Sequence, residues 1–379
     1  MKNVEKFLRR FFIRVITIFF ARQSISPTQL PLHSFKRILI IRQHDQLGDL
    51  LITTPAIRSV RTRFPEAYIA VVVREYTAPM MFNNPNVNEV IIFYENLKRW
   101  NWQKWKIFWK SIRKNSFDCV IVLNTVSRSS SSDIIALLSK APYIIGSDHL
   151  SHNPSLPEKI YNVKVPRSPE QKTEIERNLD IVKILGAEEK NFEYDLVLTE
   201  EEKKEAEKIY KELFIPENSF VVGVHFGTAD VTRRFPVEKL AKVIDAMIEK
   251  YDCEIILIIG PKEENLRDEL LTMIHHKEKI HNAPRMSLRV AAAFMNYFHL
   301  FLCNDTGTLH IASSQKIPTV SFHGMNAPAI WKPPHPRHIA VRADDTLITS
   351  ITIEQTLEAI EKAIHEIKKS PAIAGLLHY

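Results

Sequence analysis

The sequence alternates short runs of β-branched and apolar residues with longer amphipathic segments, and it does so twice. In the first half, these runs predict buried parallel strands at RILIIR (37–42), IAVVV (69–73), VIIF (90–93), DCVIVL (118–123) and YIIG (143–146). The segments between them predict helices that end near residue 63, span about 100–114 and span about 132–139. Strands and helices in this order favour an open, doubly wound parallel sheet.

The alternation pauses and then restarts. Residues 147–170, rich in Ser, Pro and Asn, are expected to form a long surface excursion, followed by helices near 171–185, ended by Gly186, and near 200–213. Further strands are predicted at FVVGVH (220–225), EIILIIG (254–260), HLFLCND (299–305), PTVSF (318–322) and HIAVR (338–342), with a last helix over about 354–369. The fold class is therefore predicted to be α/β, with two Rossmann-like doubly wound domains.

The chain length of 379 residues suits two domains of ordinary size. We expect a basic amphipathic N-terminal extension (1–35), a first Rossmann-like domain (36–205), a second one (206–345), and a C-terminal helix and tail (346–379). No internal repeat or low-complexity tract is present in the sequence.

The first residues form a basic amphipathic pattern. A helical wheel places Leu8, Phe11 and other apolar residues on one face and the cations opposite, as in helices that lie on an anionic membrane surface. We therefore expect residues 1–24 to contact a membrane. A helix docked on the protein's own core is the alternative. A signal peptide is disfavoured because Arg14 and Arg22 interrupt the apolar stretch.

The composition limits which classes of partner and which cellular compartment we expect. The net charge of +7 suits an anionic partner but does not select nucleic acid. The three cysteines lie in or beside apolar runs, and no CxxC or Cys/His zinc spacing exists. We therefore expect a reducing, cytosolic compartment, no structural metal and no cofactor.

The motifs that are missing are equally informative. The sequence contains no GxGxxG, no GxxxxGK[ST] and no Asp-x-Asp. A nucleotide bound by this chain would therefore be held by helix N-termini and cationic side chains. Five glycines follow predicted strands, which indicates a ligand cleft at the strand ends or simply glycine-containing turns: Gly48, Gly227, Gly260, Gly307 and Gly324.

The first polar cluster is RQHDQLGDLLITTPAI (42–57). It follows a predicted strand, carries His44 in a polar loop, and introduces a helix with Gly48 and Asp49. A carboxylate at such a junction is well placed to act as a general base. Asp49 would equally well cap the helix, a common role of Asp at this position.

The second cluster is VHFGTADVTRRFP (224–236), in which a glycine-containing loop ends in Arg233 and Arg234. Two guanidinium groups beside a helix N-terminus can clamp a phosphate. The alternative is a pair of solvated loop arginines.

The third cluster is LFLCNDTGTLHIASS (300–314). A strand delivers Asp305, and Thr306, Gly307 and Thr308 open a helix that carries His310. The unpaired N–H groups and dipole of such a helix suit a pyrophosphate, and Asp305 can accept hydrogen bonds from sugar hydroxyls. A single histidine on a helix more often has a structural role.

Together the three clusters resemble the ADP-heptose:lipopolysaccharide heptosyltransferases of glycosyltransferase family 9. The resemblance lies in LGDLLITTPAI, in VHFGT and RRFP, and in NDTGTLHIASS followed by PTVSFHG, and it covers about residues 36–335. It implies a GT-B fold, with an N-terminal acceptor domain and a C-terminal donor domain facing a central cleft. It also implies inverting, metal-independent transfer of heptose from ADP-heptose to a lipopolysaccharide inner-core acceptor.

The resemblance assigns roles to individual residues. Asp49 would be the catalytic base, Arg233 would neutralise the departing diphosphate with Arg234, and Asp305 would hold the donor sugar. Further donor-binding residues would be Thr228, Glu263, Thr306, Gly307, Thr308 and His310. His44 and Arg128 are assigned to the acceptor side from their location alone.

The sequence departs from the family in two turns near the expected donor. His323-Gly324-Met325-Asn326 stands where Gly-Pro-Thr is common, and Phe226-Gly227 stands where Pro-Gly is frequent. The second hypothesis is therefore a glycosyltransferase of the same fold with another donor sugar and another glycan acceptor. The third is a non-catalytic nucleotide-sugar-binding protein, against which Asp49, Arg233 and Asp305 argue together. A dehydrogenase and a nucleic-acid-binding protein are both disfavoured.

A segment rich in tryptophan and lysine lies near residues 98–110. Its tryptophans would contact lipid headgroups or an anionic glycolipid, or the segment would be a crossover helix that packs Trp105, Phe108 and Trp109 onto the sheet. We expect a protein of the cytoplasm that associates peripherally with the inner face of the cytoplasmic membrane.

Overall fold

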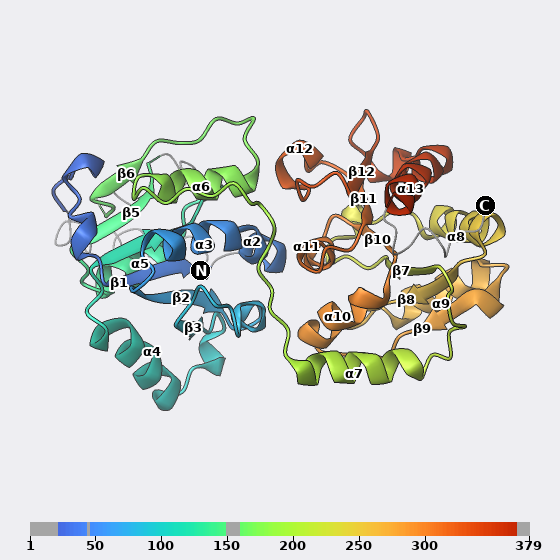
Figure 1. The fold of residues 1–379 in the computed structure, drawn as a ribbon, viewed down its shortest axis with the longest axis horizontal. Helices are drawn as coiled ribbons and strands as arrows, with labels where there is room; N and C mark the ends of the chain where they lie inside the picture. Colours follow the sequence, from blue (N-terminus) through green and yellow to red (C-terminus); the bar gives the residue numbers. More distant parts are fainter. Residues whose placement is uncertain (1–21, 44–45, 149–159, 370–379) are drawn as a thin grey trace, which may run out of the picture. The chain divides into compact units, whose positions relative to one another are not determined.

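The structure is a computed structural model that describes residues 22–43, 46–148 and 160–369. The chain forms two compact units, Met1–Asp195 and Leu196–Tyr379. Each unit is built on its own six-stranded parallel sheet (Figure 1). The predicted amphipathic helix at the N-terminus lies outside the described residues. Within the described residues, no helix combines the length and the apolar character needed to cross a bilayer.

The sheet of the first unit has the strand order β3-β2-β1-β4-β5-β6, with every neighbouring pair parallel. The strands are β1 (Arg37–Arg42), β2 (Tyr68–Arg74), β3 (Glu89–Phe93), β4 (Cys119–Val122), β5 (Tyr143–Ser147) and β6 (Val163–Val165). The order reverses between β1 and β4, so ligands are expected beyond the carboxyl ends of these two strands.

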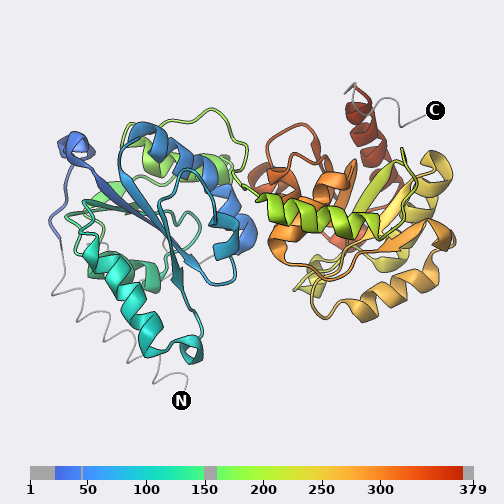
Figure 2. The same ribbon diagram turned by 60° about the horizontal axis from the view of Figure 1, so that its bottom comes forward.

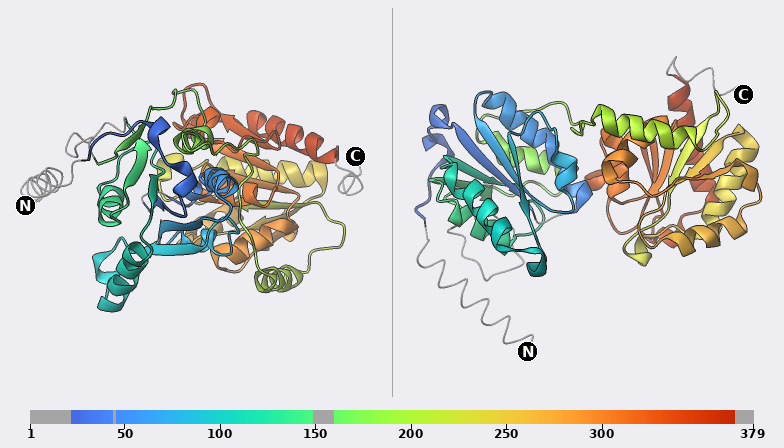
Figure 3. Two further views of the ribbon diagram at one scale, coloured as in Figure 1. Left: turned by 60° about the vertical axis from the view of Figure 1, so that its left-hand side comes forward. Right: turned by 90° about the horizontal axis from the view of Figure 1, so that it is seen from below.

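Helices cover both faces of this sheet. They are α2 (Leu47–Ile52), α3 (Thr54–Arg63), α4 (Trp102–Lys114), α5 (Ser130–Leu138) and α6 (Glu174–Lys183). α4 and α5 bury Phe108, Ile112 and Ile135 against one face of the sheet, whereas α3 and α6 pack together on the opposite face (Figure 3). Gly186 follows α6 with a φ of +71°, which is the left-handed conformation that ends many helices.

The sheet of the second unit has the order β12-β11-β10-β7-β8-β9, again parallel throughout. The strands are β7 (Val221–His225), β8 (Glu254–Leu257), β9 (Ile280–Asn282), β10 (Leu300–Asn304), β11 (Thr319–His323) and β12 (His338–Arg342). The strand order reverses between β7 and β10, as it does between β1 and β4 in the first unit.

The helices of the second unit are α7 (Glu200–Lys211), α8 (Val237–Tyr251), α9 (Glu264–Met273), α10 (Leu288–Phe294), α11 (Gly307–Ser314), α12 (Pro328–Trp331) and α13 (Ile353–Lys368). α8, α9 and α13 contribute to one hydrophobic core with the sheet. α7 lies alongside α10 (Figures 1 and 2), where Arg289 donates to Val197 O at 2.6 Å and to Glu202 Oε2 at 2.8 Å.

The predicted fold class is confirmed, since the chain contains two doubly wound parallel sheets. β6 and β9 were not predicted from the sequence, because strands of three residues carry too little periodicity to be recognised. The expected excursion over 147–170 contains β6, and its residues 149–159 lie outside the described part of the chain.

The boundary between the units lies earlier than the predicted division after residue 205, which falls inside α7. The physical reason is that α7 packs against α10 and so belongs to the second unit. α13 likewise packs against α8 and β12, so the C-terminal helix is part of this unit and not a separate segment.

A glycine in β7 makes room for an aromatic ring. A Cβ atom added at Gly223 would lie 2.3 Å from the ring of Phe298, which is itself only 4% exposed. We therefore predict that Gly223→Ala lowers the stability of the protein by about 1–3 kcal/mol through overpacking. Thermal unfolding checks this, with Gly324→Ala as the matched control, because a Cβ at Gly324 meets its nearest neighbour at an ordinary 3.5 Å. Equal melting temperatures of the two variants would contradict the packing argument.

Candidate functional site

Polar side chains gather where the central strands of the second unit end. His225 ends β7, Asn304 ends β10 and is followed by Asp305, and His323 ends β11. β7 and β11 flank β10, and the backbone N–H of Asp305 donates to Phe322 O at 2.9 Å. Because the strands are parallel, these residues meet at one edge of the sheet, which is where open α/β folds bind ligands.

The central contact is an ion pair between Arg233 and Asp305. Arg233, in the short 3-10 helix η5 (Val231–Arg233), donates from Nη2 to the backbone O of Asp305 at 2.7 Å and to its Oδ2 at 2.8 Å. The Asp305 side chain is 9% exposed, whereas that of Arg233 is 45% exposed. The ion pair therefore anchors one edge of a guanidinium group whose remainder faces solvent and can meet an anion.

Asp305 is also contacted by the turn that follows β11. Asn326 Nδ2 donates to Asp305 Oδ2 at 2.8 Å, and His323 Nδ1 lies 3.9 Å from the same oxygen. Burial acts to raise the pKa of Asp305, but His323, the Asn326 amide, His310 and Arg233 together lower it below its ordinary value. Asp305 is therefore a charged, oriented hydrogen-bond acceptor at neutral pH.

The two histidines beside Asp305 are buried. Burial lowers the pKa of both His310 and His323 to about 4, although the charge of Asp305 acts in the opposite direction. Both side chains are therefore neutral at pH 7, so His310 can offer hydrogen bonds to a ligand but no positive charge. His323 Nε2 lies 2.9 Å from Ser321 Oγ, while its Nδ1 has no hydrogen-bond partner among the described residues.

Asn304 holds the loop that carries the two arginines. Its buried side chain donates from Nδ2 to Phe226 O and accepts from the backbone N–H of Phe235, each at 2.9 Å. These two bonds fix both ends of the loop relative to the end of β10. Within the loop, Thr228 Oγ1 donates to Asp230 O at 2.6 Å, so Thr228 helps to shape the turn that leads to Arg233.

Glu263 folds back onto the loop after β7. Its Oε2 accepts from the backbone N–H of Gly260 at 2.6 Å and lies 3.5 Å from His225 Nε2. Burial acts to raise the pKa of Glu263, but His225, the Gly260 N–H and Arg234 lower it. A Cβ at Gly227 would lie 1.8 Å from Glu263 Oε1, so a larger residue at this position would displace the carboxylate. The structure thus places Glu263 beside the loop that carries Arg234.

The N-terminus of α11 completes this group of residues. Thr306 is the N-cap residue, and Gly307 and Thr308 begin the helix, where backbone N–H groups lack partners within the helix. Thr306 Oγ1 lies 2.9 Å from Thr308 Oγ1, which lies 3.4 Å from His225 Nδ1. The arrangement offers hydroxyls, amides and a helix dipole to an anion.

Two of these residues were missed by sequence analysis. His323 and Asn326 were noted only as departures from the family turn, yet both contact or approach Asp305. The available signal was the polar His323 at the end of the apolar strand PTVSF. Asn304 was noted only as the neighbour of Asp305, because its contacts join segments distant in the sequence.

The predicted base lies in the first unit. Asp49 is in the first turn of α2, just after β1, and its Oδ2 accepts from the backbone N–H of Gln46 at 2.9 Å. Gln46 is the N-cap residue of α2, and Asp49 takes part in the capping box as its N3 residue, while its side chain stays half-buried. His44 lies outside the described residues.

Arg128 is held inside the first unit. Its Nε donates to Asp133 Oδ2 at 2.9 Å, and its guanidinium lies 4.8 Å from the centre of the Tyr161 ring. The side chain is only 10% exposed. This packing accounts for Arg128 by itself, and its role toward an acceptor stays a prediction.

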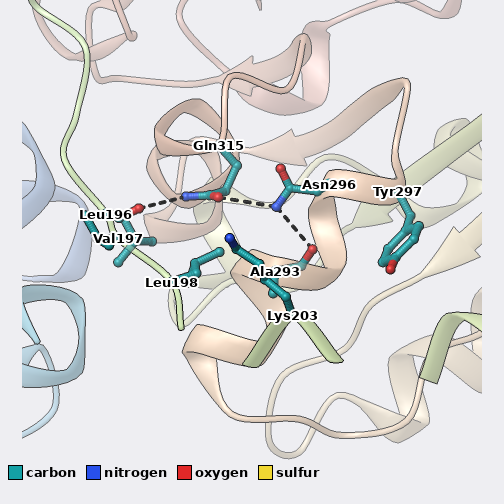
Figure 4. A pocket seen from close by; sticks show the side chains of 8 residues that line it. All are labelled: Leu196, Val197, Leu198, Lys203, Ala293, Asn296, Tyr297 and Gln315. Atoms are coloured by element: carbon teal, nitrogen blue, oxygen red, sulfur yellow. Dashed lines mark hydrogen bonds between the residues drawn. The ribbon is translucent and has the colours of Figure 1, made fainter. Parts of the chain in front are cut away.

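A separate pocket of about 550 Å³ lies in the second unit, beside α7 and α10 (Figure 4). Gln315 donates across it to Leu196 O at 3.4 Å, and Asn296 donates to Gln315 Oε1 at 3.3 Å. Its one charged lining residue, Lys203, pairs with Glu200 at 2.7 Å. We assign the candidate site to the strand ends, since they hold the charged pair and the helix N-terminus. Among the described residues, no group of three or more His, Cys, Asp or Glu side chains is arranged to hold a metal ion.

Comparisons with known proteins give a family and a shared fold. The profile of Glycosyltransferase family 9 (heptosyltransferase) matches residues 105–360. The chain is similar to a putative glycosyltransferase of Haemophilus influenzae, 24% identical over 347 residues, which are 88% of this chain and 96% of that protein. It is also similar to lipopolysaccharide heptosyltransferase 3 of Escherichia coli K12, 25% identical over 303 residues, which are 76% and 82% of the two chains. The structure of E. coli heptosyltransferase WaaC with ADP shares the fold, with a TM-score of 0.66 and 21% identity over 88% of this chain and all of the other.

The buried histidines predict acid sensitivity. In the folded chain the pKa of His310 and of His323 is about 4, below the ordinary value of 6.5. As the pH falls, these two histidines therefore bind protons in the unfolded chain before they do so in the folded chain. This contribution to stability is complete above pH 6.5 and is lost as the pH falls toward 4, by up to about 1.4 kcal/mol per pH unit and histidine. Melting temperatures between pH 7 and pH 5 check this: His323→Gln should flatten the fall, whereas the control His365→Gln, at an exposed position of α13, should not. An unchanged slope in His323→Gln would contradict the assignment.

Proposed function

The chain belongs to glycosyltransferase family 9, and from this premise we propose that it transfers heptose from ADP-heptose to a lipopolysaccharide inner-core acceptor. The transfer would invert the anomeric carbon and need no metal ion. The observation that carries the donor side of this proposal is the Arg233–Asp305 ion pair next to the N-terminus of α11. The relative in E. coli whose structure contains ADP supports an adenine nucleotide as the carrier.

On the donor side, Asp305 would accept hydrogen bonds from sugar hydroxyls, for which its charged and oriented carboxylate is suited. Arg233, with Arg234, would meet the negative charge that develops on the leaving diphosphate. Thr306, Gly307 and Thr308 would bind phosphate oxygens through hydroxyl and amide groups. Glu263, beside Gly260, stays a candidate for the ribose, with His310 and Thr228 as neighbours of the donor.

On the acceptor side, Asp49 would act as the base. It would take the proton from the acceptor hydroxyl while that oxygen attacks the anomeric carbon. The bond between that carbon and the diphosphate oxygen breaks, and ADP departs with the electron pair. His44 and Arg128 would lie toward an anionic glycolipid acceptor, and residues 1–24 would attach the protein to the inner face of the cytoplasmic membrane. No nucleic-acid partner is proposed.

A second candidate function keeps the fold and the mechanism but changes the donor sugar. It is favoured by the contacts of the divergent turn, because Asn326 binds the carboxylate of Asp305 and His323 lies beside it. Because Asn326 donates to one oxygen of the Asp305 carboxylate, it changes which lone pairs of that carboxylate a sugar can reach. A non-catalytic nucleotide-sugar-binding protein is the third candidate.

Asp49 can be tested for catalysis separately from its capping role. Asp49→Asn keeps an oxygen that can accept from Gln46 N–H but cannot take a proton at neutral pH. We predict that Asp49→Asn lowers turnover by roughly 10²–10⁴-fold, with an unchanged melting temperature and unchanged donor affinity. Asp49→Ala should lose turnover and also some stability. Turnover retained by Asp49→Asn would remove Asp49 as the base.

Donor identity is tested by calorimetry with ADP-heptose, other ADP-sugars, UDP-sugars and GDP-sugars. We predict selective binding of ADP-heptose, weakened roughly tenfold to a hundredfold by Arg233→Ala through loss of a charge-assisted contact. Arg267→Ala is the matched control, since Arg267 pairs with its neighbour Asp268 on α9. Preference for another nucleotide sugar would move the function to the second candidate. Binding without transfer, even to a lipopolysaccharide acceptor, would favour the third.

A further inference from the structure

Helix α4 of the first unit is strongly basic and rich in aromatic residues. Its sequence WQKWKIFWKSIRK contains five Lys or Arg residues and no acidic residue. Lys98 and Arg99 precede it in the chain. Four of the five tryptophans of the protein lie in this region: Trp100, Trp102, Trp105 and Trp109.

The inner face of α4 is fully explained by packing. Phe108 and Ile112 are buried in the core of the first unit. The rings of Trp100 and Trp105 stack with centroids 4.1 Å apart, and Trp105 stacks on Trp109 at 6.2 Å. The crossover-helix interpretation therefore holds for these aromatic residues.

The outer face of α4 is different. Trp102 is 82% exposed and Ile107 is 64% exposed, although both are large and apolar. The exposed cations Lys106 and Lys110 lie one turn apart on the same outer face. An apolar pair among unneutralised cations is costly to leave in water and indicates a contact surface.

The cations of this face lack internal partners. Among the described residues, no ion pair involves Lys106, Lys110 or Lys114. The lysines of α7, by contrast, pair with glutamates, Lys203 with Glu200 at 2.7 Å and Lys211 with Glu207 at 2.6 Å. The positive charge of α4 is therefore available to an anionic partner.

We propose that the outer face of α4 docks on the surface of an anionic phospholipid bilayer. The indole of Trp102 suits the headgroup region, where its apolar ring and polar N–H are both satisfied, and Ile107 would enter the acyl boundary. Lys106, Lys110 and Lys114 would meet lipid phosphates while their aliphatic stems cover apolar surface.

This surface is built from residues that follow segment 1–24 in the sequence, and its binding requires neither donor nor acceptor. Its test can therefore fail or succeed independently of the proposed transferase activity. Vesicle flotation with the full chain compares phosphatidylcholine vesicles with and without phosphatidylglycerol. The wild type should bind the anionic vesicles, and the binding should weaken as the salt concentration rises.

Two double variants of α4 are compared with matched controls. Lys106→Glu with Lys110→Glu should lower binding to anionic vesicles by at least about tenfold, since each cation near the surface contributes several-fold. Lys204→Glu with Lys208→Glu makes the same charge change on exposed positions of α7 and should leave binding nearly unchanged. Trp102→Ser with Ile107→Ser should also weaken binding, whereas Phe214→Ser, at an 87% exposed site, should not. All variants change exposed residues, so their melting temperatures should match the wild type.

Tryptophan fluorescence gives a second, direct measurement. Brominated phospholipids should quench the wild type in anionic vesicles, and Trp102→Phe should lose a large part of this quenching while still binding. Wild-type binding by both α4 variants would overturn the proposal, as would equal quenching of wild type and Trp102→Phe. A loss of affinity for duplex DNA without a loss for vesicles would overturn it in favour of a nucleic-acid surface.

Discussion

Neighbouring parallel strands that end together are the constraint on which the candidate site depends. β7, β10 and β11 lie side by side in the second sheet, so the residues after them share one edge. The ion pair between Arg233 and Asp305 joins the loop after β7 to the end of β10, and the Asn304 side chain fixes both ends of that loop. Without this register, two motifs separated by about seventy residues would not form one site.

The electrostatics of this edge follow from burial. His323, the Asn326 amide, His310 and Arg233 hold the pKa of Asp305 below its ordinary value and offset its desolvation, whereas His310 and His323 stay neutral at pH 7 because they are buried. The positive charge that an anion would meet at this edge is therefore concentrated in Arg233 and at the N-terminus of α11. In the proposed reaction these groups would supply the stabilisation of a leaving diphosphate through preorganised hydrogen-bond donors and charge.

Much of the fold could be predicted from sequence because its strands are buried on both faces and read as continuous apolar runs. β6 and β9 could not, since three residues carry no usable period. The motifs around Asp49, Arg233 and Asp305 were recognisable because each follows a strand and opens a helix. The contacts of Asn304 and Asn326 were not, because they join segments distant in the chain. The acceptor contact predicted for Arg128 from its location stays a prediction, and its ion pair with the buried Asp133 could not be predicted from the sequence.

We propose that a nucleotide binds at the carboxyl edge of the second sheet. Amide hydrogen exchange of the full chain, with and without saturating ADP, tests it most directly because it does not depend on the sugar. We predict slower exchange in the loop 226–235 and at the start of α11, with no change in α13. Protection confined to other segments, such as 196–203 and 293–297 around the pocket beside α7, would mean that the nucleotide binds elsewhere, and no protection in the second unit would mean that it does not bind there.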